Sequence, residues 1–166
     1  MKYTLNPRLE DIQELRNVYG LRIFGKLDIT NKKKKRFFSS VDNWIEKKLN
    51  KDRLPLEEQK KLLITNVVMT CKKENVKQVF VTSSTQLKDG YTAIVQEILR
   101  GLQASGIETA FGECITCKAE SLAQMGDMTK VIFVEQAGVT RYSSLENEMV
   151  LCADQSVEIL GAVVLS

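Results

Sequence analysis

The chain of 166 residues contains no histidine, and this absence excludes several kinds of site. A Ser-His-Asp triad, a Cys-His pair and an imidazole metal ligand all require histidine. The chain also lacks the side chain that most often titrates near neutral pH. Catalysis by this chain would therefore rest on carboxylates, lysine, tyrosine, serine or threonine, or on bound phosphate and metal.

Long apolar runs are also missing. No stretch approaches the roughly 18 consecutive apolar residues of a membrane-spanning helix. No secretory signal pattern is recognised, so we expect no oxidising compartment. A content of 43% apolar and 27% charged residues is typical of a globular protein, and the length suits one domain.

Charge is divided unevenly along the chain. Residues 1–78 carry 19 basic and 10 acidic side chains, whereas residues 79–166 carry 5 and 11. This division has two interpretations. One is a basic face that binds phosphates or an anionic membrane surface, and the other is lysine-rich segments that are simply exposed to solvent. The strongest candidate for a membrane or partner surface is the run Lys32, Lys33, Lys34, Lys35, Arg36, Phe37 and Phe38, because it combines cations with aromatics. No helix-turn-helix or zinc signature accompanies it, so we expect no nucleic-acid partner.

The four cysteines leave three interpretations open. Cys114 and Cys117 form a CxxC motif, whereas Cys71 and Cys152 stand far from it in sequence. A zinc site would need all four, and a redox dithiol would normally follow a strand at an early βα turn, which is not obvious here. Ordinary buried or half-buried thiols are the favoured interpretation, and no metal site is predicted.

Hydrophobic periodicity predicts an α/β domain. We expect helices over 7–19 (capped by Asn6), 40–49, 55–69, 93–104 and 143–153, and strands over 21–27, 78–82, 107–115, 130–134 and 157–165. The segment 122–128 is not assigned. Nearly continuous apolar strands that alternate with helices indicate a three-layer, doubly wound, mostly parallel sheet of about four to five strands.

The turn after the first buried strand is the best candidate for a ligand site. In an open α/β sheet, ligands bind beyond the carboxyl ends of the strands, which is where Ser83 to Thr92 are expected. A phosphate-binding loop at this place uses glycines, a lysine and a Ser/Thr hydroxyl that binds Mg²⁺. Without those groups, the turn is a tight connection in which Gly90 adopts a positive φ and Thr92 starts a helix.

Two segments of this turn resemble a known family. Val81-Thr82-Ser83-Ser84 and Gly90-Tyr91-Thr92 are similar to the deviant P-loop of bacterial tyrosine kinases of the capsular exopolysaccharide family, in which a strand ending in TSS leads into GEGKS/T. The resemblance implies a P-loop NTPase-like fold. It places Asp89 at the acidic position, Gly90 at the last glycine and Thr92 at the Mg²⁺-binding hydroxyl.

The resemblance extends over most of the chain in family order. Residues 18–25 are similar to the GLPVLG strand beside the membrane-anchored chain-length regulator segment, and residues 55–68 to the EAFRTLRTNI helix. Residues 131–141 and 159–164 are similar to the closing VLLVVRAGKTR…LGVVLN unit. The single domain 1–166 is thus expected to combine a basic membrane-proximal-like segment, 1–54, with a P-loop-like core, 55–166.

The departures from the family indicate a degenerate and shortened member. Tyr91 replaces the loop lysine, and Leu87 and Lys88 replace the earlier glycine. Glu113 alone stands in for the acidic DxD motif. The stretch between Cys117 and Lys130 is too short to contain the family's Walker B strand. The family's tyrosine-rich C-terminal tail is not recognised in this sequence either.

These departures predict a non-catalytic domain, because phosphoryl transfer depends on the missing charges. The resemblance implies a cytoplasmic domain at the inner face of the cell membrane that regulates capsular or exopolysaccharide chain length or export. Its partners would be a membrane chain-length regulator, a polysaccharide export component or a second copy of itself.

The alternative is a weak nucleotide-binding switch related to the partition-type ATPases, with ATP or ADP and Mg²⁺ as ligand. The candidate residues for weak nucleotide or anion binding are Ser83, Ser84, Lys88, Asp89, Gly90, Tyr91 and Thr92, with Glu113, Thr140 and Arg141 as secondary candidates. Packing is the favoured role of Tyr91, and solvent exposure that of Lys88.

Overall fold

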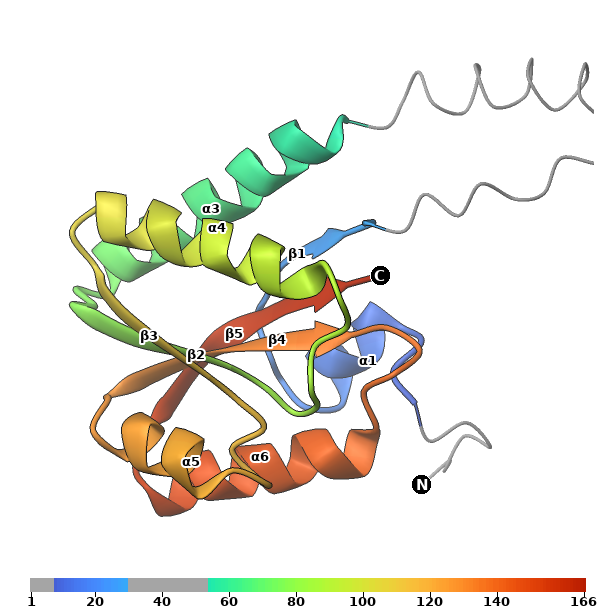
Figure 1. Cartoon of the computed structure of the whole chain (residues 1–166), viewed down its shortest axis with the longest axis vertical. Helices are drawn as coiled ribbons and strands as arrows, with labels where there is room; N and C mark the ends of the chain where they lie inside the picture. Colours follow the sequence, from blue (N-terminus) through green and yellow to red (C-terminus); the bar gives the residue numbers. More distant parts are fainter. Residues whose placement is uncertain (1–7, 30–53) are drawn as a thin grey trace, which may run out of the picture.

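A single sheet of five parallel strands organises the structure, a computed structural model that describes residues 8–29 and 54–166. The strand order is β1-β5-β4-β2-β3 (Figure 1). The strands are β1 (Ile23–Leu27), β2 (Gln78–Ser83), β3 (Glu108–Glu113), β4 (Lys130–Gln136) and β5 (Glu158–Leu165). The helices are α1 (Ile12–Asn17), α3 (Leu56–Lys73), α4 (Tyr91–Ala104), α5 (Ala119–Gly126) and α6 (Tyr142–Asp154).

Helices cover both faces of the sheet, which explains why its central strands are apolar almost throughout. On one face, α3 and α4 pack Leu63, Val67 and Ile98 against the sheet. On the other face, α1, α5 and α6 contribute Leu15, Met125 and Leu145 to a second core (Figure 1). Strand β4 is buried from Val131 to Gln136. Burial on both faces is the usual setting of a parallel sheet, so the predicted fold class is confirmed.

The N-terminal part adds an edge strand to this sheet. Strand β1 pairs with β5, and the N–H of Ala162 donates to the carbonyl of Arg22 over 2.8 Å. A Cβ atom on Gly161 would lie 2.6 Å from that carbonyl oxygen. The glycine inside the predicted last strand therefore has a packing reason, because a side chain there would push β1 away.

Several predicted boundaries need correction. Helix α1 begins at Ile12 rather than near Pro7, because the side chain of Asp11 accepts a hydrogen bond from the N–H of Gln13 (2.8 Å) and caps it there. Helix α4 begins at Tyr91, two residues earlier than predicted. Helix α5 occupies most of the segment that was left unassigned.

Some predictions lie outside the described residues. They are the Asn6 cap, the helix 40–49 and the basic and aromatic run from Lys32 to Phe38. Within the described part of the chain, no helix is both long enough and apolar enough to cross a bilayer.

Candidate functional site

The β2–α4 turn lies at the carboxyl edge of the sheet, as the sequence predicts. Ser83 is the last residue of β2 and is in register with Glu113 at the end of β3. Strand β4 runs beside β2 and ends at Gln136. Gly90 precedes α4 with a φ of 86°, the left-handed conformation expected of it. The sheet thus brings the ends of β2, β3 and β4 together around residues 84–90.

The side chain of Gln136 fills this turn. Its Oε1 accepts a hydrogen bond from the backbone N–H of Lys88 over 3.0 Å. Its Nε2 donates to Thr85 Oγ1 and to the carbonyl of Gln86, each over 3.0 Å. Gln136 is fully buried. One amide side chain therefore makes hydrogen bonds to three residues of the turn.

This arrangement differs from a phosphate cradle. A phosphate-binding loop turns successive backbone N–H groups toward the anion. Here the carbonyl of Gln86 faces the same amide group as the N–H of Lys88. Gln136 was not among the predicted site residues. The sequence does offer one signal that could have identified it, which is a polar residue at the end of a buried apolar strand.

A buried carboxylate beside Gln136 ties the turn to the sheet. Glu135 Oε2 accepts hydrogen bonds from the hydroxyls of Ser84 (2.5 Å) and Thr140 (2.7 Å), and Oε1 accepts the N–H of Ser84 (3.2 Å). Thr140 Oγ1 in turn accepts the N–H of Gln136 over 2.9 Å. Ser84 and Thr140, both predicted as ligand-binding residues, therefore make internal hydrogen bonds.

Helix α6 places a second carboxyl group against this cluster. Glu148 is buried. Among the described residues its carboxyl group makes no hydrogen bond of ordinary geometry, although it lies close enough to Glu135 and Thr82 for both to influence its pKa. Burial and the nearby charge of Glu135 raise the pKa of Glu148 well above its ordinary value. Burial also raises the pKa of Glu135, although the hydroxyls of Ser84 and Thr140 oppose this effect. Burial and the neighbouring carboxylate therefore both favour the protonated form of Glu148.

The remaining predicted residues do not converge on one point. Tyr91 is buried in the core beneath α3 and α4, as expected of a packing residue. Lys88, Asp89, Thr92 and Arg141 are exposed. The side chain of Glu113 accepts a hydrogen bond from Lys118 Nζ over 3.1 Å. The position of the family's loop lysine is thus taken by Tyr91, whose buried side chain is part of the core.

The preferred interpretation of the CxxC motif was wrong. Cys114 and Cys117 form a disulfide, whereas Cys71 and Cys152 are free and buried. The motif also lies between β3 and α5, so it does occupy a strand-to-helix turn, which brings the two Cα atoms to 5.4 Å. In the described ranges 8–29 and 54–166, no three cysteine or acidic side chains are grouped to hold a metal ion.

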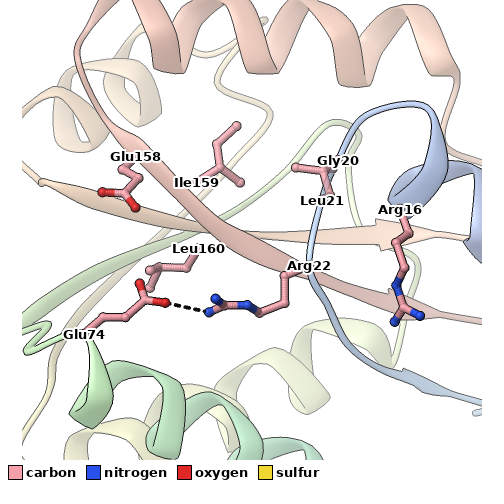
Figure 2. A pocket seen from close by; sticks show the side chains of 8 residues that line it. All are labelled: Arg16, Gly20, Leu21, Arg22, Glu74, Glu158, Ile159 and Leu160. Carbon is pink, nitrogen blue, oxygen red and sulfur yellow. Dashed lines mark hydrogen bonds and ion pairs between the residues drawn. The ribbon is translucent and has the colours of Figure 1, made fainter.

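A hollow of about 340 Å³ lies at the opposite edge of the sheet, where β1 and β5 begin. Figure 2 shows the guanidinium of Arg22 pointing toward Glu74, with which it forms a 2.9 Å ion pair. Glu158, on the same wall, pairs with Lys130. Three of the four charged residues that line the hollow are thus paired within the protein, which makes it a weaker candidate than the turn.

Comparison with known proteins adds information about the fold. No protein-family model and no curated protein matches the sequence. Among solved structures, the BceF tyrosine kinase domain is similar, with a TM-score of 0.65 over 96% of this chain and 99% of that chain. The chain has a P-loop NTPase-like fold. Sequence identity to BceF is 10%, so this likeness concerns the arrangement of helices and strands.

Proposed function

We propose that this chain is a non-catalytic, tyrosine-kinase-like domain that regulates capsular or exopolysaccharide chain length or export through contacts with other proteins. The fold likeness to a tyrosine kinase domain supports the kinase-like part of the proposal. The observation that carries the non-catalytic part is that Gln136 fills the turn where a P-loop holds phosphate.

The chemistry of the turn supports the same conclusion. Phosphoryl transfer is catalysed mainly by charge stabilisation from a lysine, Mg²⁺ and its acidic ligands. Tyr91, at the lysine position, is part of the core, and Glu113 is paired with Lys118. Removal of one electrostatic group of this kind typically costs about 10²–10³ in rate. With several groups replaced, little catalysis would remain.

The proposed partners follow from the family resemblance. They are a membrane chain-length regulator, a polysaccharide export component or a second copy of this chain, at the inner face of the cell membrane. Lys32 to Arg36, with Phe37 and Phe38, would contact anionic lipid or the partner. This run lies outside the described residues.

One observation favours the alternative of a weak nucleotide-binding switch. Helix α4 has no side-chain cap, and Gly90 turns the backbone into its first turn. Uncapped N–H groups at a helix N-terminus attract anions. A phosphate could therefore bind to the N-terminal N–H groups of α4 without entering the space that the side chain of Gln136 fills.

Deletion of the coding region in the encoding bacterium tests the proposal, with gel analysis of the polysaccharide size distribution. We expect the distribution to shift, and the wild type and Thr92→Ala to restore it equally. Thr92 is exposed and stands at the position of the Mg²⁺-binding hydroxyl, so its loss should matter only if nucleotide is used. An unchanged distribution after deletion would contradict the proposal. Failure of a folded Thr92→Ala variant to complement would favour the nucleotide switch.

A further inference from the structure

The Cys114–Cys117 disulfide differs from the other cysteines of the chain in chemistry and exposure. Cys71 and Cys152 are buried free thiols, and burial raises the pKa of Cys71 and brings that of Cys152 to about 12. Such thiols are unreactive, because the thiolate is the nucleophile. The CxxC pair is therefore the reactive sulfur pair of the described residues.

The two sulfurs of the disulfide are not equally accessible. Cys114 is 7% exposed, whereas Cys117 is exposed. Lys118 follows Cys117 directly, and α5 begins one residue later. A following helix N-terminus stabilises a thiolate, whereas Lys118 is itself paired with Glu113. Exposure thus favours attack by an incoming thiolate at Cys117 rather than at Cys114.

Backbone hydrogen bonds hold the turn independently of the sulfur–sulfur bond. The carbonyl of Cys114 accepts the N–H groups of Cys117 (3.0 Å) and Lys118 (2.9 Å), and the N–H of Cys114 donates to Ser83 over 2.8 Å. Cys114 has a φ of 50°, a left-handed conformation unusual for a residue with a side chain. Because these contacts need no disulfide, the two thiols would stay adjacent after reduction.

We propose that Cys114 and Cys117 form a reversible thiol–disulfide exchange site for an external dithiol. A thiolate of the dithiol attacks Cys117 Sγ and forms a mixed disulfide, while the bond to Cys114 breaks and Cys114 leaves as a thiolate that takes up a proton. The second thiol of the dithiol, as thiolate, then attacks the first sulfur of the same dithiol in the mixed disulfide and releases Cys117 as a thiolate, which also takes up a proton. The protein gains two electrons and two protons, and the dithiol becomes a disulfide.

The exchange site lies against the candidate turn. Cys114 Sγ is 3.6 Å from the carbonyl oxygen of Ser84, the residue whose N–H and hydroxyl bind Glu135. A disulfide sulfur has no hydrogen to donate, whereas a thiol does. Reduction therefore supplies a donor to the main chain of the turn. This inference concerns a site separate from the proposed function and does not depend on it.

A redox titration of the wild-type protein tests the exchange site. The protein is equilibrated with dithiothreitol buffers of stepped potential, alkylated under native conditions and analysed by peptide mass spectrometry. We expect Cys114 and Cys117 to titrate together, with a tenfold change in the reduced-to-oxidised ratio per about 30 mV, while Cys71 and Cys152 stay unlabelled. Independent titration of the two cysteines, or reduction only together with unfolding, would overturn the proposal.

The order of attack is tested with two single variants. Cys114→Ser keeps the accessible sulfur, and Cys117→Ser keeps the buried one. We expect oxidised glutathione to form a mixed disulfide with Cys114→Ser at least tenfold faster than with Cys117→Ser, with thermal melts confirming that both are folded. Equal rates, or a faster reaction of Cys117→Ser, would contradict the assignment of Cys117 as the attacked sulfur.

Discussion

Replacement of Glu148 by glutamine is expected to stabilise the folded protein at neutral pH and to flatten the dependence of its stability on pH. Glu148 is buried beside Glu135, and its pKa is raised well above the ordinary value. An unfolded chain would ionise this group above about pH 4.3. The folded state therefore binds more protons than the unfolded state over the window between the two pKa values.

The sign of the effect follows from proton linkage. When the folded state holds the extra proton, the free energy of unfolding falls as pH rises, by about 1.4 kcal/mol per pH unit for one proton. The stability linked to Glu148 is thus fully present below the unfolded pKa and is lost as pH rises toward the folded pKa. Glutamine carries no titrating proton, so Glu148→Gln should be about 1–3 kcal/mol more stable than the wild type at neutral pH.

Urea unfolding at stepped pH values measures this effect. Asp154→Asn is the matched control, because Asp154 is an exposed acid at the end of the same helix. We expect the control to keep the wild-type slope. A wild-type stability that rises with pH above about 5, or equal slopes for Glu148→Gln and the wild type, would show that Glu148 does not hold the proton.

Replacement of Gln136 by leucine is expected to cost about 2–4 kcal/mol of folding stability, because a fully buried side chain loses its three hydrogen bonds to the turn. Leucine is close to glutamine in size but offers no polar atom to the turn. For a domain of this length, the loss corresponds to a fall in Tm of roughly 5–15 °C. Thermal and urea unfolding followed by circular dichroism measure it.

Two variants sharpen this prediction. Gln136→Glu keeps an acceptor for the N–H of Lys88 but turns a carboxylate toward the carbonyl of Gln86, so it should also be destabilising above its pKa. Gln86→Ala removes an exposed side chain and leaves that carbonyl in place, so it should change stability by less than about 0.5 kcal/mol. If Gln136→Leu were as stable as Gln86→Ala, Gln136 would not hold the turn.

The fold could be predicted largely from the sequence, because the strands are buried on both faces. Apolar runs such as Val79–Val81 and Val131–Val134, which are short and rich in β-branched residues, indicate such strands, and segments of helical periodicity separate them. Helix α5 escaped prediction because it is short, ends at Gly126 and has no side-chain cap. Local signals were too weak there, and packing against the sheet decides its conformation.

The contents of the turn could be predicted less well. The sequence placed the turn at the carboxyl edge and identified Tyr91 as a packing residue, but it did not show that Gln136 would fill the space. Gln136 lies about 50 positions from the turn, and only the pairing of β4 with β2 brings them together. Glu135 and Glu148 were missed for the same reason. Their interaction depends on how α6 lies across the end of β4.

The disulfide illustrates a third limit. Sequence spacing allows a CxxC pair to be free, metal-bound or oxidised. The positive φ of Cys114 and its hydrogen bond to Ser83 set the distance between the cysteines, and neither is visible in the sequence. The expected compartment and the lack of further metal ligands therefore favoured free thiols, although local geometry brings the sulfurs together.

Isothermal titration of the wild-type protein with ATP and Mg²⁺ tests the central claim, that this chain works without nucleotide, most directly. The account predicts no saturable heat at millimolar nucleotide and no stabilisation of the folded state by mass action. Thr92→Ala serves as the control for any weak signal, because it removes the hydroxyl at the Mg²⁺ position. Saturable, Mg²⁺-dependent binding to the wild type that Thr92→Ala abolishes would contradict the account.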